Sequence, residues 1–178
     1  RRQRQMCIRD SHESVASKLE IIDKIVIRTQ EPAIRIISKV GKLANAADRD
    51  HCIQYMVAVG LIFGDLIAEY YEDDFHQENQ LIDKLRDKMI IEEDNQFSMD
   101  YLDPEKRSIA NAVQVFFNDG KCSDDIQIEY PIGHKKRREE GIPLLEEKFW
   151  NNLNTCFDKD KSKLIYDLCL DQEKLEKT

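Results

Sequence analysis

The 178 residues predict an α+β fold on the strength of three observations. The run Ile25-Val26-Ile27 is typical of a β-strand, and Asn118-Asp119-Gly120 is typical of a hairpin turn. From Pro143 onward, apolar residues recur at helical spacing. We therefore expect an α+β domain of interleaved strands and helices over residues 12–134, followed by a helical segment over residues 135–178.

The first half of the chain begins with a predicted strand within residues 18–28. Residues 33–38 place Ile34 and Ile37 one helical turn apart, which predicts a short helix. Small and polar residues then indicate a loop over residues 41–47. Residues 48–71 are apolar on nearly every side and predict one long buried helix.

In the second half of the chain, predicted helices and strands alternate more often. We expect the acidic run at residues 72–78 to be a solvated loop. The remaining patterns predict, in order, a helix over residues 79–87, a strand at 89–91, a turn at 103–104, paired strands at 109–117 and 126–130, and helices beginning at 143 and near 164.

Composition excludes several classes of function. The formal charge is −8, and polyanion binding depends on clustered cations, so we expect no nucleic-acid partner. No stretch approaches the roughly 18 consecutive apolar residues of a membrane span. None of the five cysteines forms a C-x-x-C pair, which indicates reduced thiols and no metal site.

Residues 1–11 are expected to be foreign to the protein. Read back through the genetic code, RRQRQMCIRD and the start of the next codon correspond to a transposase sequencing-library adapter. The interpretation predicts that these residues pack against nothing and that the native sequence is missing its N-terminal part.

A polar stripe is the most distinctive candidate site. On one continuous helix Asp48, His51 and Tyr55 fall on one face, which suggests acid/base chemistry. Alternatively, Asp48 is only the helix N-cap, and His51 and Tyr55 are hydrogen-bonded core residues. The other histidines, His76 among them, lack an acidic or cysteine partner at ligand spacing. The basic run at residues 134–138 reads better as a solvated connector than as a nucleic-acid contact.

Three blocks of the sequence carry a resemblance: ADRDHCIQYMVAV, DPEKRSIANAVQVFFNDG and EYPIGHKKRREEGIPLLEEKF. With them the chain resembles the MmgE/PrpD family over residues 12–178. The resemblance implies a hydro-lyase that dehydrates 2-methylcitrate to 2-methyl-cis-aconitate in the methylcitrate cycle of propionate catabolism. It also implies a large helical domain with a smaller α+β lid, of which this chain would hold the lid and the return to the helical domain.

The resemblance bears on Tyr55 in particular. The wider family carries an active-site tyrosine in a pattern similar to D-A-K-F-S-x-x-Y, and DRDHCIQY keeps Asp48 and Tyr55 at that spacing. The residues between them differ, so no family match supports His51. We take Tyr55 and His51 as candidate catalytic residues, and Arg49 and Asp48 as candidate substrate-binding residues. A catalytic Tyr55 hydroxyl should lie at a cleft edge beside Arg49 or His51, without a buried acceptor.

Further expectations follow from the resemblance. They are a tricarboxylate substrate, no metal or other cofactor, a homodimer of the full-length protein, and a cytoplasmic location, or the mitochondrial matrix in a eukaryote. The fragment alone should be inactive. The alternatives are another carboxylic-acid lyase, decarboxylase or epimerase of the family, or a noncatalytic domain that kept the lid fold.

Overall fold

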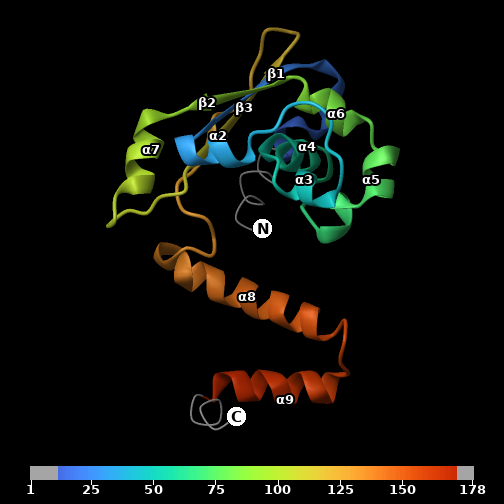
Figure 1. Ribbon diagram of the computed structural model, residues 1–178, viewed down its shortest axis with the longest axis vertical. Coiled ribbons are helices and arrows are strands. Elements are labelled where there is room, and N and C mark those ends of the chain that lie inside the picture. Colours follow the sequence, from blue (N-terminus) through green and yellow to red (C-terminus); the bar gives the residue numbers. More distant parts are fainter. Residues whose placement is uncertain (1–11, 172–178) are drawn as a thin grey trace. The chain divides into compact units, whose positions relative to one another are not determined.

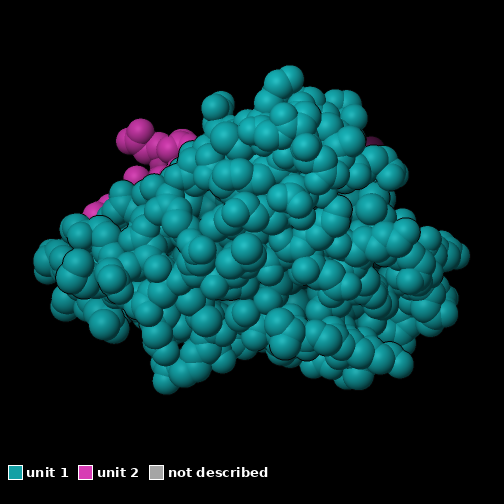
Figure 2. Space-filling model, turned by 90° about the horizontal axis from the view of Figure 1, so that it is seen from above, with its two compact units in different colours: residues 1–131 teal, residues 132–178 magenta. Residues whose placement is uncertain are grey.

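The computed structural model describes residues 12–171 and divides the chain after Pro131 into two compact units (Figures 1 and 2). The first unit mixes strands and helices, and the second, from Ile132, is helical. The predicted α+β class is confirmed. The adapter interpretation concerns residues 1–11, which lie outside the described residues.

A four-stranded mixed sheet in the order β2-β1-β3-β4 organises the first unit. Its strands are β1 (Ile22–Thr29), β2 (Met89–Glu93), β3 (Asn111–Phe117) and β4 (Ile126–Ile128). β2 runs parallel to β1, whereas β3 is antiparallel to both β1 and β4. The strand and hairpin patterns of the sequence therefore correspond to real elements.

The register places the apolar side chains of neighbouring strands on one face. Ile25 lies opposite Met89 and Val115, and Ile27 lies opposite Ile91 and Val113. Because alternate residues of a strand share a face, these pairs form a continuous apolar layer. Ile25 and Ile27 are fully buried there.

Helices of the first unit complete this core. They are α2 (Glu31–Ile37), α3 (Ala46–Asp50), α4 (Ile53–Phe63), η3 (Ala68–Tyr71), α5 (Asp73–Glu78), α6 (Leu81–Arg86) and α7 (Asn95–Leu102), with η2 (Ala16–Ile21) before β1. Figure 1 shows α3 to α6 grouped together and α7 at the opposite end of the unit. All residues of α4 from Ile53 to Leu61 are buried, which explains why its sequence is apolar all round.

The single long helix expected over residues 48–71 is wrong. α3 ends at Asp50, Cys52 is extended with φ −126° and ψ 111°, and α4 begins afresh at Ile53. At the other end Gly64 adopts the left-handed conformation, φ 69°, and terminates α4. Apolar composition correctly indicated burial but could not show these two breaks.

Two further differences concern polar segments. The acidic run expected as a loop forms α5, which has Asp73 and Asp74 in its first turn, where carboxylates favour a helix. The helix α7 was not predicted. Its N-cap Asp94 accepts hydrogen bonds from the backbone of Gln96 and Phe97, and this capping residue is a signal that the sequence does contain.

The second unit holds η4 (Lys135–Arg137), α8 (Arg138–Leu153) and α9 (Lys159–Leu170). α8 begins at Arg138 rather than at Pro143, because the η4 turn runs directly into it. A Cβ at Gly141 would lie 2.4 Å from the Ile132 carbonyl oxygen, so a glycine permits the connector to approach the helix. The Tyr166 ring packs on the Trp150 ring with centroids 4.7 Å apart.

Several large apolar side chains of α8 and α9 are exposed. Leu145 is 55% exposed, and Leu164 and Leu170 are 71% and 67% exposed. Among residues 12–171, no helix is both long and apolar enough to cross a membrane.

Candidate active site

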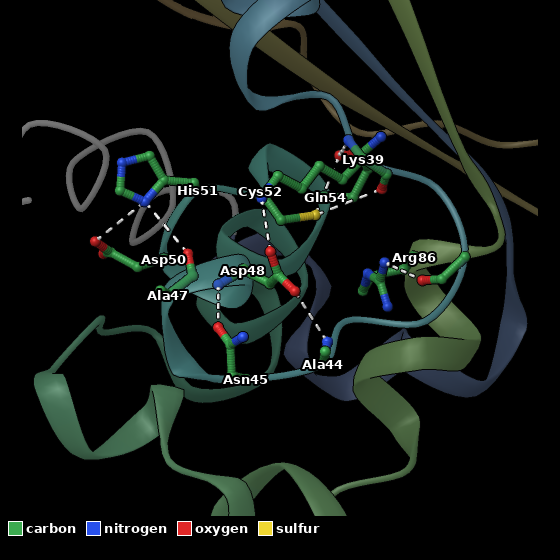
Figure 3. Close-up of polar contacts among 11 residues, drawn as sticks. Lys39, Ala44, Asn45, Ala47, Asp48, Asp50, His51, Cys52, Gln54 and Arg86 are labelled. Atoms are coloured by element: carbon green, nitrogen blue, oxygen red, sulfur yellow. Dashed lines mark hydrogen bonds and ion pairs between the residues drawn. The ribbon is translucent and has the colours of Figure 1, made fainter.

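Asp48 is part of a polar network at the start of α3 (Figure 3). Its carboxylate accepts hydrogen bonds from the Lys39 ammonium and the Ala44 backbone amide, both at 3.1 Å. These two donors hold the pKa of Asp48 below its usual value. The N-cap of α3 is Asn45, whose side chain accepts from the Asp48 amide, so the alternative that made Asp48 the N-cap is wrong.

Arg49 is almost completely buried, with 2% of its surface exposed. Its Nε donates to the Tyr71 carbonyl oxygen at 2.6 Å, and its Nη2 contacts the Asp73 carboxylate. These contacts join α3 to the end of η3 and the start of α5. A buried guanidinium that satisfies a backbone carbonyl and a carboxylate is an anchor for those segments.

Tyr55 is fully buried on α4. Its hydroxyl donates to the Tyr70 carbonyl oxygen at 2.8 Å, so it has the acceptor that a catalytic hydroxyl was expected to lack, and its geometry matches the alternative of a hydrogen-bonded core residue. Its ring lies against the rings of Tyr71 and His76, with centroids 6.0 and 5.5 Å away. Burial raises the pKa of Tyr55 to about 12, so the phenol keeps its proton at neutral pH.

His51 lies in a different environment. Its side chain is 62% exposed, and its Nδ1 lies 3.3 Å from the Ala47 carbonyl oxygen and 3.7 Å from the Asp50 carboxylate. Figure 3 shows it pointing away from the network around Asp48. Because the extended Cys52 separates α3 from α4, Asp48, His51 and Tyr55 do not form the stripe of one helix. Their parts in a reaction remain predictions.

A cluster that sequence reasoning missed lies beside Tyr55. His76 Nε2 is 3.4 Å from the Asp83 carboxylate, which also contacts Arg86. Arg86 Nη2 donates to the Gly41 carbonyl oxygen at 2.9 Å. His76 therefore has an acidic partner, although the two residues are not at the spacing of metal ligands. No sequence signal reveals it, because α5 and α6 are separate helices.

Burial lowers the pKa of His76 below 6.5, and the nearby Asp83 opposes this shift. The cluster thus combines a neutral imidazole, a protonated phenol and the Asp83 carboxylate paired with the buried Arg86 guanidinium. In the described part of the chain, no three His, Cys, Asp or Glu side chains gather as a metal site would require. The chemistry that these side chains can offer is proton transfer and the binding of carboxylates.

Comparison with known proteins identifies the class to which this fold and these residues belong. Residues 6–172 match the MmgE/PrpD C-terminal domain, so the chain belongs to the MmgE/PrpD family. The match includes part of the segment interpreted as adapter, an interpretation that stays a prediction.

Comparison with individual relatives is more specific than the match to the family. The chain is 52% identical to the 2-methylcitrate dehydratase of Salmonella typhimurium over 155 residues, which cover 87% of this chain and 32% of that protein. It is 46% identical to the mitochondrial 2-methylcitrate dehydratase of Yarrowia lipolytica, covering 90% and 31%. A fungal alkylcitrate dehydratase is 42% identical, covering 84% and 30%. The chain thus spans about a third of the length of these relatives.

The anchoring role of Arg49 predicts a large loss of stability on its removal. Arg49→Met should lower the free energy of unfolding by about 2 kcal/mol or more, because the Tyr71 carbonyl loses a charged donor. The matched control is Arg35→Met, which breaks an exposed pair with Glu31 and should cost less than about 0.5 kcal/mol. Urea unfolding measures both, and equal losses would refute the role.

The partly buried His76 predicts a pH dependence of stability. Folding lowers the pKa of His76 from its value of 6.5 in the unfolded chain. The neutral imidazole therefore makes its full contribution to stability at pH values above 6.5, and this contribution is lost as the pH falls below 6.5. Between about pH 7.5 and about pH 5.5, His76→Leu should therefore lose stability less steeply than the wild type.

Urea unfolding at the two pH values checks this expectation. His51→Leu, which replaces an exposed histidine by the same residue, is the matched control variant. A wild-type slope in the His76 variant would contradict the expectation.

Proposed function

We propose that this chain is the C-terminal part of a 2-methylcitrate dehydratase. The observation that carries the proposal is 52% identity over 87% of the chain to an enzyme of that name. The reaction removes a proton from one carbon and hydroxide from its neighbour, forming a carbon–carbon double bond and one molecule of water. It would supply 2-methyl-cis-aconitate to the methylcitrate cycle of propionate catabolism.

Such an elimination needs a base at carbon and an acid at the departing hydroxyl group. Tyr55 suits the acid, because its phenol stays protonated, but it would have to exchange the Tyr70 carbonyl for the substrate. His51 is exposed and can meet a substrate directly. We propose these two as catalytic, and Asp48 and Arg49 as substrate-binding, although the Arg49 guanidinium already contacts Asp73.

The three carboxylates of 2-methylcitrate demand more cationic groups than residues 48–55 contain. We therefore propose that residues 12–134 are a lid and that residues 135–178 return to a large helical domain. The exposed leucines of α8 and α9 support the second part, since helices with such faces need a partner. The remaining catalytic groups would belong to that domain.

The oligomeric state and location extend the proposal. We propose a homodimer of the full-length protein in the cytoplasm, or in the mitochondrial matrix of a eukaryote. One relative is a mitochondrial enzyme by name.

A second candidate function is the dehydration of a different alkylcitrate. The similarity to an alkylcitrate dehydratase favours it over decarboxylation or epimerisation, which remain alternatives within the family. A noncatalytic lid-fold domain is the alternative from another class. Comparing kcat/KM for 2-methylcitrate with that for citrates bearing longer alkyl groups separates the two dehydratases.

The proposal predicts that the complete enzyme dehydrates 2-methylcitrate and that residues 12–178 alone do not. The fragment contains the lid without the domain that would enclose the substrate. Ultraviolet absorbance of the unsaturated product measures both. Absence of activity in the complete protein would argue for the noncatalytic domain, and turnover by the fragment would contradict the division into two domains.

The proposed catalytic role of Tyr55 leads to a separate prediction. In the complete enzyme Tyr55→Phe should lower kcat by about 10²-fold or more, through the loss of a proton donor. It should also lower stability by about 1 kcal/mol, because the hydrogen bond to Tyr70 is lost. Steady-state kinetics corrected for the folded fraction decide the matter, since an unchanged kcat would make Tyr55 purely structural.

A further inference from the structure

The end of α7 and the loop after it present an unusual set of exposed side chains. Met99, Leu102 and Ile109 are 59%, 73% and 39% exposed, and Tyr101 is 38% exposed. Glu105 and Arg107 are exposed between them. We call these six side chains the α7 surface. Figure 1 shows α7 at the end of the first unit opposite α5 and α6, the helices that carry His76 and Asp83.

The loop is held in a defined shape. The Arg107 amide donates to the Asp103 carbonyl oxygen at 2.8 Å, and the Ser108 amide donates to the Asp100 carbonyl oxygen at 3.1 Å. The Lys106 ammonium pairs with the Asp100 carboxylate at 2.7 Å. Arg107 has φ 44°, which is uncommon for a residue with a side chain. These contacts present Glu105 and Arg107 on a fixed backbone.

Arg107 differs from the other arginines within residues 12–131. Arg28, Arg35, Arg49 and Arg86 each contact a carboxylate, whereas within residues 12–171 the guanidinium of Arg107 contacts none. The Glu105 carboxylate likewise has no cationic partner among those residues. The chain carries a net charge of −8, so an arginine left unpaired is not explained by a shortage of acidic groups.

We propose that the α7 surface is where two copies of this chain meet about a two-fold axis. In such an interface the same patch faces itself, so Arg107 of each copy can pair with Glu105 of the other. Methionine, tyrosine and arginine are enriched in protein interfaces, and the apolar side chains around the pair would exclude water from it.

The charges favour a second copy over a different acidic partner. An acidic protein would pair with Arg107 but would repel Glu105, whereas a second copy neutralises both. Six side chains form a small interface, so the affinity contributed by this surface alone should be weak. The inference specifies the interface of the proposed homodimer, and it does not depend on the reaction catalysed.

The test is sedimentation velocity of the full chain over a series of concentrations. Arg107→Glu and Glu105→Arg should each raise the dissociation constant about tenfold or more, because like charges then face each other across the axis. The double variant exchanges the two charges and should restore association to near the wild-type level. Lys121→Glu, which changes the charge equally at a side chain of the hairpin between β3 and β4 that is 78% exposed, is the matched control and should have no effect.

Other outcomes would overturn the proposal. A wild-type chain that stays monomeric contradicts this interface, and so does dimerisation that is unaffected by Arg107→Glu. Failure of the double variant to recover association would show that the two residues do not pair. A lowered melting temperature of Arg107→Glu with unchanged association would mean that another part of the same chain covers the surface. None of these measurements uses enzymatic activity, so they leave the proposed reaction to its own test.

Discussion

The burial of α4 is the constraint on which the rest of the first unit depends. A helix that is apolar on every side must be covered all round, and here the sheet, α3 and α6 contribute to that cover. Ile25, Ile27, Val113 and Val115 provide the apolar layer of the sheet in the same core. Burying this surface is the dominant favourable contribution to folding, and it fixes where α3, α5 and α6 can lie.

Burying polar groups beside such a core costs free energy, and hydrogen bonds to those groups offset this cost. Arg49 is hydrogen-bonded to the Tyr71 carbonyl and to Asp73, and Tyr55 is hydrogen-bonded to the Tyr70 carbonyl. Both residues thus tie the segment from η3 to α5 onto α3 and α4. Burial raises the pKa of Tyr55 and lowers the pKa of His76, so in both side chains it favours the uncharged form.

The residues of the candidate site therefore fall into two groups, which differ in how much they contribute to packing. Tyr55 and Arg49 are integral to the packing, and a role in catalysis would require them to serve the substrate in addition. His51 is exposed and makes weaker contacts, so it can change roles at little cost to stability. Kinetics and unfolding measurements on the same variants distinguish these contributions, because a structural residue lowers the folded fraction and a catalytic one lowers kcat.

The sequence by itself determined the class of fold, the strands and the burial of residues 53–61, because alternation and apolar composition reflect burial directly. Its motifs also sufficed to indicate the family. Only the tertiary structure decided where the apparent long helix breaks, since the extended Cys52 and the left-handed Gly64 alter neither composition nor periodicity. It also decided the partners of Arg49, Tyr55 and His76, which lie 7 to 24 residues away along the chain on other elements. Contacts between separate elements depend on how those elements pack, and no local pattern encodes that arrangement.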